Sequence, residues 1–186
     1  LVAGVLLTGV WVALTGGLHL DGLADCCDGL LVSADRERRL EIMKDSRLGA
    51  FGGMGLALAL ILKAALITEL LQGALWGPLM LAASLGRWFI LLAAQQPKAR
   101  PGGLGETFSR GIDRKSIFIS ALVPLMLVVW QGAAAWVALG VAVLVLSALL
   151  FAVRRRLGGV TGDVFGLVVE VTELVVLLIF SMKCWG

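Results

Sequence analysis

The sequence predicts an all-α, polytopic integral membrane protein, folded as a helical bundle in the lipid bilayer. Three observations lead to this fold class. The chain of 186 residues is 59% hydrophobic and only 16% charged, whereas soluble domains average about 45–50% apolar and about 25% charged residues. Its apolar residues form long runs, such as 141–152, without the alternation typical of a membrane β-barrel. Basic residues gather in every second loop, which is the pattern that orients helical membrane proteins.

Six apolar segments predict the order of the membrane helices. The first, Leu1–Thr15, is shorter than the roughly 20 residues that a span needs, and the chain begins with Leu inside this run. We therefore expect further apolar sequence upstream, and we treat residues 1–186 as a single membrane-embedded domain. The other segments are Phe51–Leu71, Leu75–Ala94, Ile117–Trp130, Ala133–Val153 and Val164–Met182. The short Ile117–Trp130 segment should begin nearer Lys115 or be partly re-entrant, and residues 130–132 should form a tight turn.

Charged and uncharged loops alternate along the chain. Basic side chains occur in residues 32–50, 95–116 and 154–162, whereas the turns near 72–73 and 130–132 have none. The positive-inside rule assigns the basic loops to the cytoplasm, so we expect the aspartates within residues 21–28 to lie at the cytoplasmic face of the membrane as well. Two interpretations of these basic residues are open: they orient the protein and contact anionic lipid, or they attract anionic nucleotides. Short juxtamembrane loops with few aromatic residues do not predict nucleic-acid binding.

Three aspartates at spacing i, i+4 and i+7 form the first candidate site: Asp21, Asp25 and Asp28. On an α-helix, Asp25 and Asp28 lie roughly 40° and roughly 20° from Asp21, so all three point one way. Crowded anions repel one another unless a cation lies between them, and oxygen ligands suit Mg²⁺ or, as a substitute, Mn²⁺. The spacing predicts a metal site for a phosphorylated substrate, with a solvated helix end as the alternative. His19, the single histidine, is either structural or catalytic.

A second group of charges lies in residues 41–53. Lys44 and Arg47 have side chains that hold phosphate oxygens, and Asp45 is a fourth candidate metal ligand. The alternative interpretation of this segment is an amphipathic interfacial helix with internal ion pairs.

A third group of carboxylates lies in the last apolar segment. Two helical turns separate Asp163 from Glu170, which places them on one face, and Glu173 follows one turn later. A carboxylate inside the membrane needs a partner or a wet cavity. We expect Arg87, at a matching depth in its own segment, to form an ion pair with Glu170 or to line a polar cavity open to the cytosol. Lys63 is explained by snorkelling to the interface.

Four motifs resemble signatures of the cobalamin synthase family, adenosylcobinamide-GDP ribazoletransferase. The motifs are Gly16–Asp25 with Asp28-Gly29, Glu41–Gly52, Gly158–Asp163 with Glu170 and Glu173, and the middle loop Arg100–Gly105. The resemblance spans essentially the whole chain. The departures are the missing N-terminal apolar sequence and Cys26-Cys27, which occupy positions that are often small or polar and which we expect to be reduced bystanders.

This resemblance implies that residues 1–186 form a single membrane-embedded catalytic domain in the inner membrane of a prokaryote, with its active site facing the cytoplasm. The implied reaction is the last assembly step of coenzyme B12. Adenosylcobinamide-GDP would give its cobinamide phosphate to α-ribazole or α-ribazole 5′-phosphate, with release of GMP and a requirement for Mg²⁺. The metal ligands would be Asp21, Asp25, Asp28 and Asp45, and the substrate contacts would be Lys44, Arg47, Arg87 and Glu173. His19, Asp163 or Glu170 would position or deprotonate the attacking hydroxyl. Membrane lipid is an expected partner, and a homo-oligomer or a complex with other corrinoid-pathway enzymes stays open.

Two other classes of protein share parts of this pattern. Membrane phosphotransferases of the CDP-alcohol type use paired Asp-x-x-Asp-Gly motifs, which residues 25–29 echo without the expected Ala-Arg after the glycine. A transporter could use Glu170, Glu173 and Arg87 as an ion relay. Transporters place such groups near the midplane of internal repeats, however, and this chain has no visible repeat.

Overall fold

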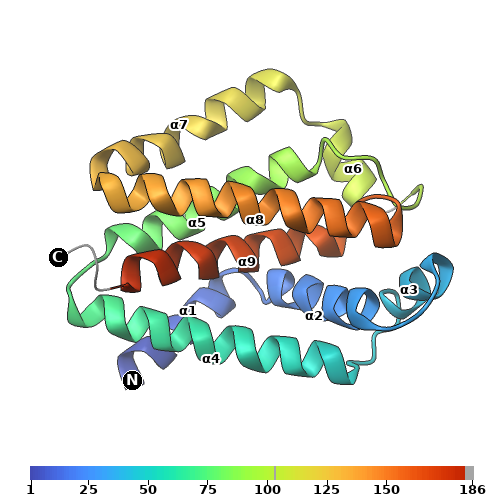
Figure 1. Ribbon diagram of the computed structural model, residues 1–186, viewed down its shortest axis with the longest axis horizontal. Helices are drawn as coiled ribbons and strands as arrows, with labels where there is room; N and C mark the ends of the chain where they lie inside the picture. Colours follow the sequence, from blue (N-terminus) through green and yellow to red (C-terminus); the bar gives the residue numbers. More distant parts are fainter. Residues whose placement is uncertain (103, 183–186) are drawn as a thin grey trace.

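The computed structural model describes residues 1–102 and 104–182, which fold as an all-α bundle (Figure 1). Four helices, α4, α7, α8 and α9, are long and apolar enough to cross a membrane. Helices α1 and α2 together form a fifth candidate span, bent by 92° between them, and α5 is a shorter apolar helix. The helices are α1 (Val2–Leu14), α2 (Leu18–Leu31), α3 (Arg36–Ile42), α4 (Ala50–Gln72), α5 (Gly77–Ala93), α6 (Leu104–Arg110), α7 (Arg114–Gln131), α8 (Ala133–Leu157) and α9 (Gly162–Ser181).

Each predicted apolar segment corresponds to a helix, and the predicted fold class is confirmed. The short fourth segment begins at Arg114 because the Asp113 side chain accepts a hydrogen bond from the Ser116 N–H, 2.8 Å away, and so caps the helix. The predicted turn after it is also present. Gly132 adopts φ 76° and ψ −147°, a conformation that suits glycine alone, and α8 starts directly afterwards.

Helix α9 is the central helix of the bundle. It packs against α2, α4, α5 and α8, and Figure 1 shows it between α8 and α4. In its most apolar window 61% of the residues are buried, compared with 17% to 33% in the other three candidate spans. The polar residues of α9 therefore face other helices, and lipid contacts little of this helix.

Helices α2 and α9 approach each other closely at two glycines. A Cβ atom on Gly22 would lie 2.6 Å from the carbonyl oxygen of Asp163, and one on Gly166 would lie 2.7 Å from that of His19. Small residues permit such backbone contact between membrane helices. This contact brings the first motif, on α2, against the third motif, at the start of α9.

The basic loops lie at one end of the bundle. Figure 1 shows α3, α6 and the N-terminal ends of α4 and α9 at the right-hand end, whereas the turns after α4 and after α7 lie at the opposite end. The alternation of charged and uncharged loops therefore corresponds to the two ends of the bundle. The cytoplasmic side and the inner membrane stay predictions.

Candidate active site

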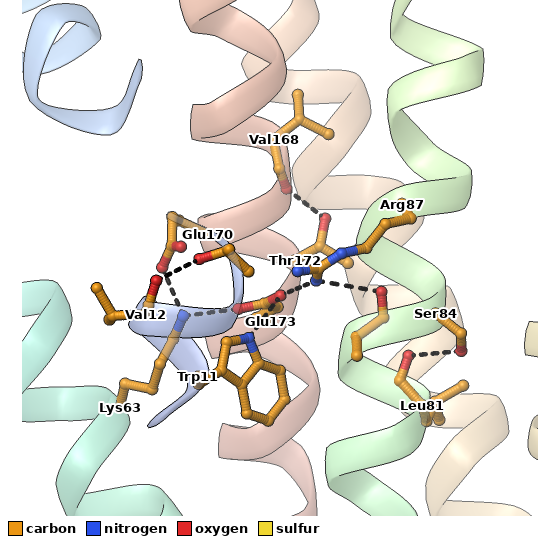
Figure 2. A network of polar contacts seen from close by, with 12 residues as sticks. Trp11, Val12, Lys63, Leu81, Ser84, Arg87, Val168, Glu170, Thr172 and Glu173 are labelled. Atoms are coloured by element: carbon orange, nitrogen blue, oxygen red, sulfur yellow. Dashed lines mark hydrogen bonds and ion pairs between the residues drawn. The ribbon is translucent and has the colours of Figure 1, made fainter. Parts of the chain in front are cut away.

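A buried ion-pair network lies at the centre of the bundle (Figure 2). Lys63 of α4 points inward, and its Nζ atom lies 2.6 Å from Oε2 of Glu170 and 2.6 Å from Oε2 of Glu173. The exposed fraction of the side chain is 1% for Lys63 and 0% for Glu173. One ammonium group thus joins two carboxylates that stand one turn apart on α9.

Glu173 is the point where four helices meet. Its Oε1 atom accepts hydrogen bonds from Nη1 of Arg87 on α5 and, at 3.3 Å, from Nε1 of Trp11 on α1. The Trp11 ring also lies 5.6 Å from the Lys63 ammonium, within cation–π range. Two cations balance two carboxylates, so the network carries no net charge, as a low-dielectric interior requires.

Two expectations about this region are wrong. Lys63 does not snorkel to the interface, because α4 packs on α9 and turns this side chain toward both glutamates. Arg87 pairs with Glu173, and the expected partner, Glu170, is held by Lys63 instead. Charge balance is the sequence signal that could have identified Lys63 as the partner of these glutamates. Two glutamates inside an apolar helix need two cations, and among the predicted spans only Arg87 and Lys63 supply them.

His19 lies between this network and the aspartates. Its Nδ1 atom is buried and has no hydrogen-bond partner within residues 1–102 and 104–182. The charges that act on its imidazole belong to Arg87, Glu173 and Lys63, and its backbone contacts α9 at Gly166. An unpartnered imidazole nitrogen beside a charged site is available to accept a proton or a hydrogen bond.

Asp21, Asp25 and Asp163 form an acidic group across the contact between α2 and α9. The charged groups that act on Asp25 are Asp163, Asp21 and Asp28. Asp163 in turn interacts electrostatically with Asp21 and with the guanidinium group of Arg100. Its carboxylate accepts a hydrogen bond from Thr161 Oγ1 at 3.1 Å. Tertiary structure thus joins carboxylates from two motifs that are far apart in sequence.

Asp28 caps the start of α4. Its two carboxylate oxygens accept hydrogen bonds from the backbone N–H groups of Gly49 and Gly52, each at 2.8 Å. A Cβ atom on Gly49 would lie 2.7 Å from the Asp28 Cγ atom, so a larger residue would push the carboxylate away. This cap links the first and second motifs and explains the two glycines. Sequence reasoning missed it, although glycines at a helix start were a signal.

Asp45, Arg47 and Lys44 lie in the connection between α3 and α4. The expected alternative, an amphipathic helix through residues 41–53, is wrong, because α3 ends at Ile42 and α4 begins at Ala50. Hydrogen bonds and charge from Arg47 lower the pKa of Asp45 to about 2, and the two side chains approach to 2.6 Å. Lys44 is exposed and has no side-chain partner in the described part of the chain.

Several arginines that were predicted only as basic loop residues cap helix ends. Arg36 donates hydrogen bonds to the carbonyl oxygens of Leu157 and Ala99, both at 2.8 Å. Arg39 donates to the last carbonyls of α2, and Arg100 donates to a carbonyl of α3. Cations at helix C-termini satisfy orphan carbonyls and favour the helix dipole. These side chains hold together the end of the bundle at which the aspartates lie.

The four predicted metal ligands do not gather at one point in the described part of the chain. Within the described ranges, no group of three or more His, Cys, Asp or Glu side chains is arranged to hold a metal ion. Asp28 and Asp45 already accept hydrogen bonds from N–H groups and from Arg47. Mg²⁺, however, is usually bound through one or two carboxylates together with substrate phosphates and water. Asp21 and Asp25, one turn apart and without a hydrogen-bond partner in this part of the chain, fit such a two-carboxylate site.

The fold and the site define a polytopic membrane protein that carries a charged, carboxylate-rich site between its central helices. The sequence model of the family described as cobalamin-5-phosphate synthase matches residues 1–181, and the chain belongs to this family. The predicted resemblance to this family is thereby confirmed.

Curated relatives agree with the family match. The chain is 42% identical over 188 aligned positions to adenosylcobinamide-GDP ribazoletransferase of Pseudomonas syringae pv. syringae strain B728a, covering 97% of this chain and 75% of the relative. The enzyme of the same name from Escherichia coli K12 is 41% identical, with 91% and 70% covered. That from Syntrophobacter fumaroxidans is 40% identical, with 99% and 75% covered. No solved structure matches the chain.

Proposed function

We propose that this chain transfers the cobinamide phosphate of adenosylcobinamide-GDP to α-ribazole or its 5′-phosphate. The products are adenosylcobalamin or its 5′-phosphate, and GMP. Family membership and the names of the relatives support this reaction over a CDP-alcohol phosphotransferase activity. The structural observation that carries the proposal is the contact at Gly22, which sets Asp21 and Asp25 against Asp163 beside His19.

The reaction is a displacement at the phosphorus next to cobinamide. A hydroxyl oxygen of the acceptor forms the new P–O bond, the bond to the bridging pyrophosphate oxygen breaks, and GMP leaves with that oxygen. The hydroxyl proton must be accepted, and the charge on the transferred group must be balanced. The site therefore needs a base, cations and a means of holding a pyrophosphate in line.

Asp21 and Asp25 are the residues that would hold Mg²⁺. The metal would supply charge neutralisation on the pyrophosphate and orient its oxygens. Asp163 lies opposite this pair and would orient the acceptor hydroxyl, as would Glu170 from deeper in the bundle. Asp28 and Asp45 support the site indirectly, because Asp28 caps α4 and Asp45 holds Arg47.

Two of the candidate substrate-binding cations, Lys44 and Arg47, lie at this end of the bundle, and Arg87 lies in the network at its centre. Lys44 is exposed and unpaired in the described chain, so it can contact a phosphate directly. Arg47 forms an ion pair with Asp45, and Arg87 forms one with Glu173. Both guanidinium groups would therefore contact the substrate from fixed positions. His19 Nδ1, which has no hydrogen-bond partner in the described residues, would be a candidate acceptor for the hydroxyl proton beside Asp163 and Glu170.

The substrates would enter from the end that carries the basic loops. By the positive-inside rule this end would face the cytoplasm, and membership of the cobalamin synthase family supports the inner membrane of a prokaryote as the location. Basic side chains at this end attract the anionic nucleotide substrate.

A turnover assay tests the proposal. Full-length protein in nanodiscs receives adenosylcobinamide-GDP, each acceptor in turn, and Mg²⁺, and GMP and the cobalamin product are quantified. Asp25→Asn should lower turnover by about a hundredfold or more, whereas Asp113→Asn, which removes a charge from a helix cap at the same end, should keep near-normal turnover. Absence of product with both acceptors, from protein shown to be folded, would contradict the proposed reaction.

A further inference from the structure

A cavity of about 590 Å³ lies beside α8, and none of the residues that line it belongs to the proposed active site. Its lining consists of Gln96, Ser147, Leu150, Phe151, Arg154 and Arg155. Figure 1 shows α7 diverging from α8 toward the end with the basic loops, which is the end where Arg154 and Arg155 lie.

The lining changes from apolar to basic along α8. Ser147 and Arg155 are separated by about 12 Å along the helix axis. Leu150 and Phe151 occupy the middle of this stretch, and Phe151 is 61% exposed on a helix apolar enough to span the membrane. The basic residues follow in the last turn. Such a sequence of surfaces matches the boundary between the acyl chains and the headgroups of a bilayer.

The two arginines of the cavity lack a carboxylate partner within residues 1–102 and 104–182. Arg36, Arg39, Arg100 and Arg156, at the same end, donate to backbone carbonyls of helix ends. Arg154 makes no side-chain hydrogen bond in this part of the chain, and the Arg155 guanidinium lies 5.2 Å from the Phe151 ring centroid. Adjacent cations without a counter-charge repel each other, so this cavity favours an anion.

We propose that this cavity binds one anionic phospholipid. Its phosphate would contact Arg154, Arg155 and the Gln96 amide, and its acyl chains would lie along Leu150 and Phe151. A soluble nucleotide would satisfy the arginines but would leave the exposed Phe151 ring uncovered. A zwitterionic lipid would satisfy the apolar lining but would neutralise the arginines less. The site is independent of the proposed reaction, because none of its residues belongs to the proposed active site.

The test is lipid retention by the full-length protein, measured by native mass spectrometry in a neutral detergent. Phosphatidylglycerol is compared with phosphatidylcholine of the same acyl chains. Each cation near an anionic headgroup contributes about fivefold in binding, so Arg154→Gln/Arg155→Gln should weaken retention of one phosphatidylglycerol by about 30-fold. The matched control is Arg114→Gln/Lys115→Gln, which removes the same charge from exposed positions at the same end and should retain the lipid.

A second variant separates the cavity from general electrostatics. Ser147→Trp fills the apolar part without changing charge, and it should also reduce retention. Equal retention of both lipids, equal loss in the control, or unchanged retention in both cavity variants would overturn the proposal. Displacement of the lipid by GMP would assign the arginines to a nucleotide and would overturn it as well.

Discussion

The Lys63 ammonium lies 2.6 Å from a carboxylate oxygen of Glu173, and the surrounding helices enclose both side chains almost completely. The same carboxylate accepts hydrogen bonds from Arg87 and Trp11. The Lys63–Glu173 pair therefore connects α4 and α9 with α5 and α1. Burying these charges has a large desolvation cost, which is offset only while all partners are present. The pair therefore acts as a unit that holds Arg87 in place beside the proposed active site.

Replacement of Lys63 should lower the free energy of unfolding more than replacement of an exposed lysine. Lys63→Met leaves two buried carboxylates with one cation, and loss of one partner of a buried pair costs about 3–5 kcal/mol. Thermal and denaturant unfolding in micelles measures this loss. Lys115→Met, at an exposed position, should change stability by less than about 0.5 kcal/mol. Similar stability of the two variants would show that Lys63 is not part of an essential buried pair.

Gly22 should not tolerate a methyl group. Gly22→Ala places a Cβ atom 2.6 Å from the Asp163 carbonyl oxygen, so α2 and α9 must separate, and overpacking of this kind costs about 1–3 kcal/mol. Activity should fall with stability, because this contact aligns the two motifs. Gly140→Ala on α8, where a Cβ atom would meet nothing within 4 Å, is the control and should be neutral or stabilising. A fully active, stable Gly22→Ala protein would contradict the importance of this contact.

Asp28 should act on stability through the cap of α4. Asp28→Ala removes the acceptor for the N–H groups of Gly49 and Gly52 and should cost about 1–2 kcal/mol, whereas Asp28→Asn keeps one acceptor oxygen and should cost less. The Mg²⁺ concentration for half-maximal activity separates the cap from the predicted metal role. We expect it to stay unchanged in Asp28→Asn. A marked rise at unchanged stability would instead support Asp28 as a metal ligand.

Asp45 should not contribute to the pH dependence of activity near neutral pH, because its carboxylate stays ionised there. Arg47 lowers the pKa of Asp45 from 3.8 to about 2, so the contribution of this ion pair is complete above about pH 4 and is lost only as the pH falls toward the lowered pKa. The pH–rate profile of Asp45→Asn should therefore run parallel to that of the unchanged protein above about pH 5. An acid limb that moves in this variant would show that Asp45 titrates in the working range.

Local features of the sequence were sufficient for much of the fold. Apolar runs located the spans, because the thickness of the bilayer sets their length. The turn at Gly132 and the helix start near Lys115 followed from residues adjacent in sequence. The aspartates on one face of α2 followed from helical periodicity. Each of these inferences depends on neighbours within a few turns.

Partner choice between distant residues was not accessible in this way. Arg87 and Glu170 have matching depths, but depth does not specify how each helix is rotated about its axis. Rotation of α4 and α9 decided that Lys63 takes Glu170 and that Arg87 takes Glu173. Helix rotation and packing also decided that Asp28 caps α4 and that Arg36 donates to the Leu157 carbonyl at the end of α8. Neither contact follows from the local sequence.

The sequence by itself therefore determined the helical membrane fold, the end of the bundle that carries the basic loops, and the family, since segment length, charge and motif are properties of the chain read locally. Only the tertiary structure decided which carboxylates face one another and which cations neutralise them. That choice depends on the contact of α2 and α9 at Gly22 and Gly166 and on the cost of burying any charge without a partner.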